Sequence, residues 1–216
     1  MVKKIYAEFL GTFTLVFIGA GAIVVGKADL LGIAMAHGLA IAVMICAFAA
    51  VSGAHFNPAV SFGMLVTGRI SIKDFFVYVL SQLAGATVAA GLLKAIMGSA
   101  AGGALGIPAL APGVGTMQAM LAEALGTFLL VSVIFGVAVD RRGTFGAVAG
   151  FPIGLTISLS ILFFGPLTGA AINPARWFGP ALISGHFSHA LVWIIGPLVG
   201  GAAASLIYQT VIQPEK

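Results

Sequence analysis

Charged side chains are scarce in this chain: Lys, Arg, Asp and Glu account for 7% of its 216 residues, whereas hydrophobic residues account for 60%. Soluble domains carry about 25% charged residues, so the composition excludes a soluble globule and indicates an integral membrane protein. The few basic residues form no tract, which leaves no case for nucleic-acid binding. A single cysteine, Cys46, excludes an intrachain disulfide.

The residue combinations that carry catalysis are also missing. The sequence shows no nucleophile with a partner base, no set of metal ligands and no cofactor motif. We therefore expect neither an enzyme nor a bound metal or cofactor.

Six apolar stretches are long enough to cross roughly 30 Å of hydrocarbon as helices. They are Ile5–Val25, Leu30–Val51, Asp74–Met97, Met117–Val139, Gly146–Phe164 and Phe187–Val211. Most basic residues fall on one side of this six-span arrangement, namely Lys3, Lys4, Arg69, Lys73, Arg141, Arg142 and Lys216. The positive-inside rule makes this side cytoplasmic, so we expect a multi-pass protein of the cell membrane with both termini in the cytoplasm.

The two halves of the chain resemble each other. AEFLGTFTLV (Ala7–Val16) and AEALGTFLLV (Ala122–Val131) agree at eight of ten positions, at an offset of 115 residues. We expect one domain over residues 1–216, with repeats at about 1–100 and 117–216. Three spans per repeat is an odd number, so the second repeat is inverted in the membrane relative to the first.

Each half also contains an Asn-Pro-Ala motif, in SGAHFNPAVSFG (Ser52–Gly63) and in TGAAINPARWFG (Thr168–Gly179). Asn favours the N-cap of a helix and Pro its first position. The segments that follow, Pro58–Thr67 and Pro174–Ser184, reach only roughly 15 Å at 1.5 Å per residue. The predicted fold is therefore all-α, with six transmembrane helices and two re-entrant half-helices that meet at the midplane. Unwound backbone at that depth must line a wet pore or be buried in protein.

The paired motifs, the paired AExLGTF segments and Arg176 after the second motif resemble the aquaporin, or major intrinsic protein, family over essentially the whole chain. The resemblance implies a passive water channel that excludes protons and ions, assembled as a homotetramer in the bilayer. The pore motifs would be Asn57, Pro58, Ala59, Asn173, Pro174 and Ala175. The two Asn amides can donate hydrogen bonds to one water oxygen and so interrupt proton transfer along the water file. Alternatively, both asparagines serve only as helix caps.

By the same resemblance, a four-residue constriction would consist of His37, Ile161, Ala170 and Arg176. This set is similar to that of plant tonoplast intrinsic proteins, several of which pass water and also ammonia or other small neutral solutes. Two alternatives stay open, because Arg176 could only anchor its half-helix by snorkelling and His37 could only be a packing residue.

Glycerol is a less favoured substrate. Glycerol facilitators usually carry Asp directly after the arginine and a basic residue four positions later, where this chain has Trp177 and Ala181. A glycerol or small-polyol facilitator therefore remains an alternative, and a proton-coupled secondary transporter is a more remote one.

Glu8 and Glu123 occupy equivalent positions in the two repeats. A carboxylate inside hydrocarbon needs hydrogen-bond donors, and the backbone N–H groups of the two re-entrant loops are the expected partners. His55 is expected to support the first loop in the same way. The alternative for the two carboxylates is a proton-coupling site.

Overall fold

The computed structural model describes residues 1–98, 103–143 and 146–213, so Lys216 lies outside the described residues. Within these ranges the chain is helical and contains no strand. Six segments are long and apolar enough to cross a membrane: Val2–Val25, Leu30–Ser52, Ile72–Met97, Thr116–Val139, Gly146–Thr168 and Ala190–Ile212. The predicted all-α fold with six spans is therefore confirmed.

Three predicted span limits differ from the structure by three or four residues, and the first of these is the start of the first span, at Val2 rather than Ile5. The fifth span continues past Phe164 to Thr168 and ends where Gly169 adopts a left-handed conformation. The sixth begins at Ala190 rather than Phe187, because His189, at the N-cap, has a left-handed φ of 55° and so cannot belong to the helix. The latter two limits are set by backbone turns that hydropathy does not report.

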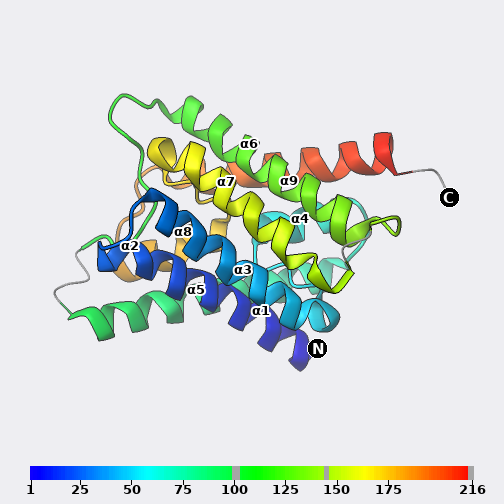
Figure 1. Cartoon of the computed structure of the whole chain (residues 1–216), viewed down its shortest axis with the longest axis horizontal. Coiled ribbons are helices and arrows are strands. Elements are labelled where there is room, and N and C mark those ends of the chain that lie inside the picture. The colour runs from blue at the N-terminus through cyan, green and yellow to red at the C-terminus, as the bar shows by residue number, and fades with distance from the viewer. Residues whose placement is uncertain (99–102, 144–145, 214–216) are drawn as a thin grey trace.

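The spans lie side by side in one bundle (Figure 1). In chain order the elements are α1 (Val2–Thr14), η1 (Leu15–Ala20), α2 (Gly21–Val25), α3 (Leu30–Ser52), α4 (Pro58–Val66), α5 (Ile72–Met97), α6 (Thr116–Ile134), η3 (Phe135–Val139), η4 (Gly146–Val148), α7 (Gly150–Thr168), α8 (Pro174–Ser184), α9 (Ala190–Ile207) and η5 (Tyr208–Ile212). We call the end where α1 begins and η5 ends the near end. The opposite end, where α2 ends and α3 begins, is the far end.

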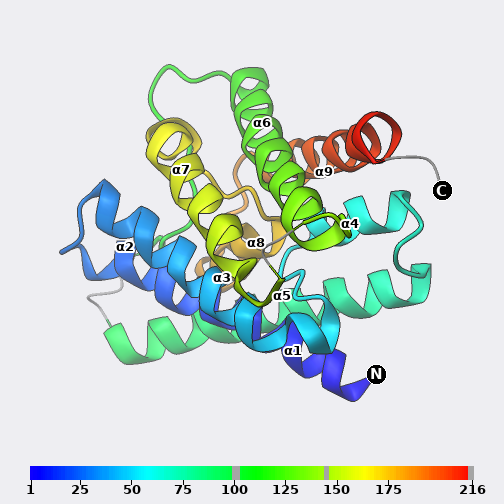
Figure 2. The same cartoon turned by 45° about the vertical axis from the view of Figure 1, so that its right-hand side comes forward.

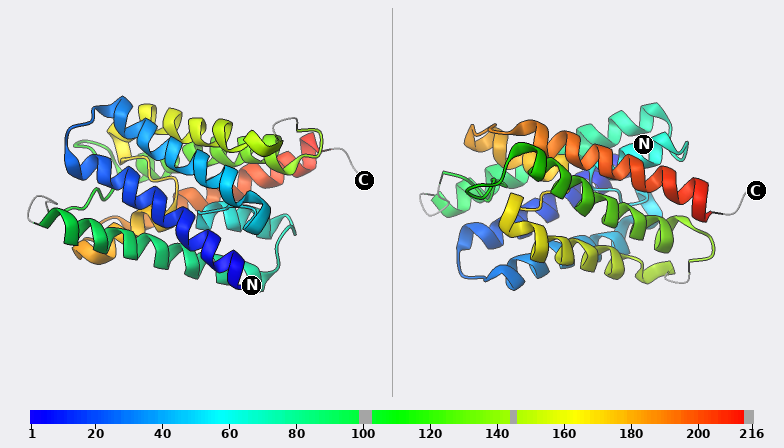
Figure 3. Two further views of the ribbon diagram at one scale, coloured as in Figure 1. Left: turned by 60° about the horizontal axis from the view of Figure 1, so that its bottom comes forward. Right: turned by 90° about the horizontal axis from the view of Figure 1, so that it is seen from above.

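The two repeats form opposite sides of the bundle. In Figure 3, α1 and α5 are in front in the left view, whereas α6 and α9 are in front in the right view. The helices α4 and α8 lie between these sides and are too short to span (Figure 2). The half-helix α4 extends toward the near end and α8 toward the far end (Figure 1).

Both half-helices begin as their sequence predicts. The Asn57 side chain caps α4 by accepting from Ala59 N at 2.8 Å, and Asn173 caps α8 by accepting from Ala175 N at 3.0 Å. A proline follows each cap at the first helical position, where its missing N–H costs nothing. The first half-helix ends at Val66, one residue before the predicted end at Thr67.

Glycines let the spanning helices approach at backbone contact. A Cβ added to Gly154 of α7 would lie 2.2 Å from the carbonyl oxygen of Gly38 on α3. A Cβ added to Gly200 of α9 would lie 2.0 Å from the carbonyl oxygen of Ala124 on α6. Small residues at such crossings are typical of membrane helix packing, where close contact replaces the hydrophobic driving force.

Gly154→Ala is expected to destabilise the protein by about 1–3 kcal/mol, because the new Cβ forces α3 and α7 apart. Thermal unfolding of the purified protein in detergent measures the effect. Gly91→Ala on α5 is the matched control, since a Cβ there meets nothing within 4 Å. Equal midpoints for the two variants would contradict the close α3–α7 contact.

Candidate functional site

A cavity of about 900 Å³ runs between the two repeats. At the far end its wall includes His37 and Arg176, at the middle Asn57 and Asn173, and at the near end Asp140. Ile161 and Ala170 also line it. The structure therefore brings the predicted motif asparagines and all four predicted constriction residues to the wall of one cavity.

At the middle of the cavity the two re-entrant loops hold each other. Asn57 Nδ2 donates to Ile172 O at 2.8 Å, and Asn173 Nδ2 donates to Phe56 O at 2.9 Å. An amide group has two N–H donors, so each asparagine retains one donor for the cavity that it lines. The N-termini of α4 and α8 add a partial positive charge at this level.

The loop backbone before each asparagine has an unusual shape. Ala54 and Phe56 in the first loop have φ values of 53° and 51°, and Ala170 and Ile172 in the second have 44° and 41°. Non-glycine residues in this left-handed region cost roughly 1–3 kcal/mol each and persist only where the surroundings hold them. Both loops are therefore held in place by their contacts.

Glu8 supplies these contacts to the first loop. Its carboxylate accepts from Ser52 Oγ at 2.6 Å, His55 N at 3.0 Å, Phe56 N at 2.7 Å and Gln82 Nε2 at 2.7 Å. The Glu8 side chain is fully buried. Its four donors compensate for the loss of water around the charge.

Glu123 holds the second loop in the same way. It accepts from Thr168 Oγ1 at 2.6 Å, Ala171 N at 3.0 Å and Ile172 N at 2.6 Å. Within the described part of the chain, neither Glu123 nor Glu8 is among the residues that line the cavity. Both carboxylates thus face loop backbone rather than the passage.

The imidazole of His55 lies beside the first loop. Its Nδ1 is 3.0 Å from Ser61 Oγ on α4, and its ring packs edge-on against Tyr78 with centroids 5.0 Å apart. Tyr78 in turn donates to Ser52 O at 2.6 Å. His55 therefore links the loop to α4 and α5, and it also lines the cavity.

Arg176, which is 2% exposed, lies at the centre of the predicted far-end constriction. Its Nη1 donates to Gly106 O at 2.9 Å, and its Nη2 lies 3.3 Å from His37 Nε2. His37 Nδ1 lies 2.9 Å from Ile33 O, a carbonyl that can only accept, so Nδ1 carries the proton and Nε2 accepts from Arg176. The Nε of Arg176 has no partner among the described residues.

Two residues near this constriction escaped the sequence analysis. Gly106 belongs to an uncharged connection whose only signal is its glycines, yet its carbonyl binds Arg176. Trp177, to which the sequence assigned no role, stacks on Trp193 of α9 with ring centroids 6.1 Å apart and an interplanar angle of 13°. Trp177 therefore packs α8 against α9.

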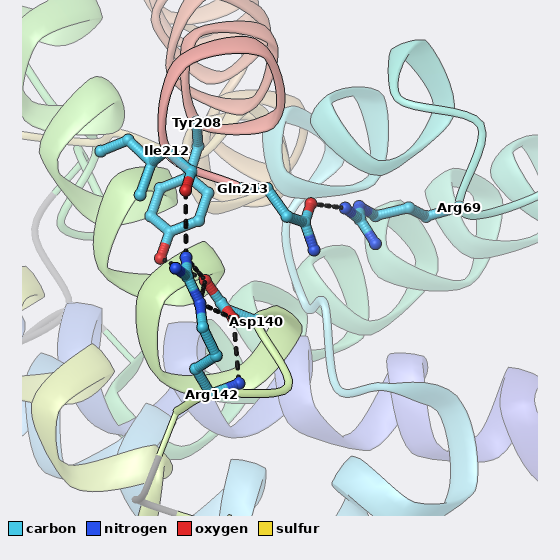
Figure 4. Close-up of polar contacts among 6 residues, drawn as sticks. All are labelled: Arg69, Asp140, Arg142, Tyr208, Ile212 and Gln213. Carbon is cyan, nitrogen blue, oxygen red and sulfur yellow. Dashed lines mark hydrogen bonds and ion pairs between the residues drawn. The ribbon is translucent and has the colours of Figure 1, made fainter. Parts of the chain in front are cut away.

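A polar cluster ties two segments together at the near end (Figure 4). Arg142 Nη2 donates to Asp140 Oδ2 at 2.6 Å and to Ile212 O at 3.0 Å, and Tyr208 donates to the same Asp140 oxygen at 3.1 Å. The hydrogen bonds from Arg142 hold the pKa of Asp140 well below its usual range. The cluster fixes the connection after η3 to η5 beside the cavity mouth.

A second contact joins η5 to the end of α4. Arg69, which follows α4, donates to the side chain of Gln213 (Figure 4). The Arg69 guanidinium also lies over the ring of Phe135, 5.2 Å from its centroid. Arg69, which lines the near end of the cavity, is thus held by protein groups.

Comparisons with known proteins agree on one family. The family described as Major intrinsic protein matches residues 1–208. Aquaporin NIP1-1 of Zea mays is 40% identical over 97% of this chain and 75% of its own length. Glycerol uptake facilitator protein-like 6 of Lactiplantibacillus plantarum is 41% identical over 94% of this chain and 95% of its own. The X-ray structure of the aquaglyceroporin from Plasmodium falciparum superposes with a TM-score of 0.91 at 29% identity, covering 98% of this chain and 96% of that one.

Glu123→Gln is expected to destabilise the protein by about 1–3 kcal/mol, because the amide offers one acceptor atom where three donors converge and leaves a buried donor unpaired. Thermal unfolding in detergent measures the loss. Asp74→Asn is the control, since that carboxylate is partly exposed in its ion pair with Lys4. Wild-type stability of Glu123→Gln would show that the carboxylate does not hold the second loop.

Asp140→Asn is expected to lower the protection of the Arg142 amide, which donates to Asp140 Oδ1 at 2.9 Å, against hydrogen exchange. Because folding lowers the pKa of Asp140, its stabilising effect is present above the ordinary value of about 3.9 and is lost as the pH falls through the folded value below it. The wild-type protection factor should therefore stay constant from about pH 8 to about pH 5. A decline within that window would contradict the ion pair.

Proposed function

The chain belongs to the major intrinsic protein family, and on that basis we propose that it is a passive channel for water that also admits ammonia or similarly small neutral solutes and holds back protons and ions. The observation that carries the proposal is the single cavity that passes the two motif asparagines and then the guanidinium of Arg176. A molecule that moves through this cavity must pass first the asparagine amides and then the guanidinium, or the reverse.

The middle of the passage is the barrier to protons. Asn57 and Asn173 each keep one N–H donor beyond their mutual contacts. Two donors on one water oxygen turn the hydrogens of that water away in both directions, which breaks the chain along which a proton would hop. The N-termini of α4 and α8 add an electrostatic penalty for any cation at the same level.

The far-end constriction selects for small neutral molecules that accept hydrogen bonds. Arg176 lines the cavity and has N–H donors beyond those bonded to Gly106 and His37, while Ile161 and Ala170 provide an apolar wall. A water oxygen or an ammonia nitrogen can accept from the guanidinium, whereas a cation is repelled by its charge. The lone pair of His37 Nε2 is occupied by Arg176, so the imidazole acts here as bulk and as a partner of the arginine.

Glycerol is the second candidate solute. A relative named as a glycerol uptake facilitator and the structural likeness to an aquaglyceroporin both favour it. Against it stand the imidazole of His37 in the constriction and the departures at Trp177 and Ala181 from the residues usual in glycerol facilitators. The osmolyte of the experiment below is chosen to separate the two solutes.

A proton-coupled transporter is less well supported. Coupling needs a titrating group that the transported path can reach. Glu8 and Glu123 instead accept hydrogen bonds from loop backbone and neighbouring side chains. We therefore assign both carboxylates to the support of the re-entrant loops.

Assembly and orientation belong to the same proposal. The homotetramer is supported by the family resemblance alone. The cytoplasmic placement of the near end is supported by the basic residues that gather there: Lys3, Lys4, Arg69, Lys73, Arg141 and Arg142. The proposed location is the cell membrane.

Light scattering by proteoliposomes after a hypertonic glycerol shock tests the proposal. Fast shrinkage with a low activation energy and without fast re-swelling is the expected result, because water passes and glycerol does not. His37→Phe should retain water permeability but lose ammonia permeability several-fold, since a bulkier ring narrows the constriction. Leu39→Phe, at a position of the same helix that is 44% exposed, is the matched control.

Each opposite outcome has a distinct meaning. Shrinkage no faster than that of empty liposomes would contradict a water channel. Fast re-swelling would replace the proposal with a glycerol facilitator. Equal ammonia permeability in His37→Phe and wild type would remove His37 from the constriction.

A further inference from the structure

The first spanning helix contains a π-helical turn, η1, at Leu15–Ala20. Such turns are rare and often mark functional sites. The repeat offset of 115 residues maps Leu15–Ala20 onto residues 130–135, where Leu130–Ile134 is α-helix in α6 and a second π-helical turn, η3, begins at Phe135. Both repeats therefore contain a π-turn in their first span, but η1 begins earlier in its repeat than η3 does.

The His37 imidazole packs against Gly19 of η1. A Cβ added to Gly19 would lie 2.4 Å from His37 Cδ2 and 2.6 Å from His37 Nε2. No side chain other than hydrogen fits there while the ring keeps its position. The ring therefore rests directly on the backbone of Gly19, with its Nε2 toward Arg176.

Ala20, the next residue of η1, contacts Gly106, whose carbonyl is the second acceptor for Arg176. Gly106 packs on Ala20, because a Cβ on Gly106 would lie 2.9 Å from the Ala20 carbonyl oxygen and 3.0 Å from the Ala20 Cβ. Gly106 has a φ of 67°, which favours glycine independently of this contact. Its carbonyl accepts from Arg176 Nη1 at 2.9 Å.

We propose that the π-turn η1 supports the selectivity constriction. Gly19 positions the His37 imidazole and Ala20 positions the Gly106 carbonyl. These two acceptors then hold the Arg176 guanidinium beside the passage. Gly19 is thus a positioning residue that determines solute selection without touching the solute. The consequence for transport rests on the proposed function, whereas the geometric claim does not.

The direction of the effect follows from the packing of His37. The ring has Gly19 on one side, it is held to Ile33 O of its own helix through Nδ1, and it faces the cavity. A methyl group at position 19 must displace the ring, and the cavity is the open side. The displaced ring narrows the passage and separates Nε2 from Arg176.

Gly19→Ala tests the positioning role by stopped-flow light scattering. Water permeability is expected to fall by about tenfold, which corresponds to about 1.4 kcal/mol on the barrier. Gly21→Ala, just beyond η1 in the same span, is the matched control and should conduct as wild type, because its Cβ would meet only the Leu93 Cδ2 methyl at 3.2 Å. Gly19→Ala conducting as well as Gly21→Ala would overturn the proposal.

A double-mutant comparison separates positioning from general damage. In a His37→Ala background there is no ring to displace, so adding Gly19→Ala should leave permeability unchanged. A further loss of similar size in that background would mean that Gly19→Ala acts by distorting the first span, and would overturn the role of Gly19.

A structure of Gly19→Ala gives a readout that does not depend on transport. The His37 ring should be displaced and its contact with Arg176 Nη2 lost, whichever solute passes. If the wild type conducts no water but the His37 ring moves in Gly19→Ala, the proposed function fails and the positioning role of η1 is supported. If the His37 ring does not move in Gly19→Ala, the positioning role of η1 is overturned even if the wild type is a water channel.

Discussion

Unwound backbone inside a bilayer must find its hydrogen-bond partners within the protein, because lipid offers none. The two re-entrant loops meet this constraint through each other and through one buried carboxylate apiece. The Asn57 and Asn173 amides bind the carbonyls of the opposite loop, and Glu8 and Glu123 bind the N–H groups of their own loops. Without these contacts neither half-helix could begin in the middle of the bundle, and the two asparagine amides would not meet at the middle of the cavity.

The two-fold arrangement holds at the centre and breaks at the ends. The central contacts come in pairs, one from each repeat, and the left-handed residues occupy matching loop positions. At the far end, Arg176 has no basic counterpart in the first motif, where Val60 follows Ala59. At the near end, Asp140 and Arg142 form an ion pair that fixes η5. The symmetric core thus lies between two chemically different ends of the cavity.

The buried charge of Arg176 explains why its surroundings are so specific. A guanidinium at this depth is costly unless acceptors are held in place for it. One acceptor comes from the side chain of His37 and the other from the backbone of Gly106, and both rest on the π-turn η1. The two acceptors of Arg176 therefore pack on small residues of η1, Gly19 and Ala20.

Several features were determined by the sequence alone, because each is a local or periodic property. Apolar length located the six spans, the Asn-Pro pairs located the starts of α4 and α8, and the repeat implied inversion and identified Glu8 and Glu123 as a pair. The tertiary structure alone decided which atoms meet. Three contacts of this kind join separate elements: Gly106 binds Arg176, Trp177 stacks on Trp193, and His37 packs on η1. No pattern in the sequence encodes these distances, since they follow from how closely the glycine-lined helices pack.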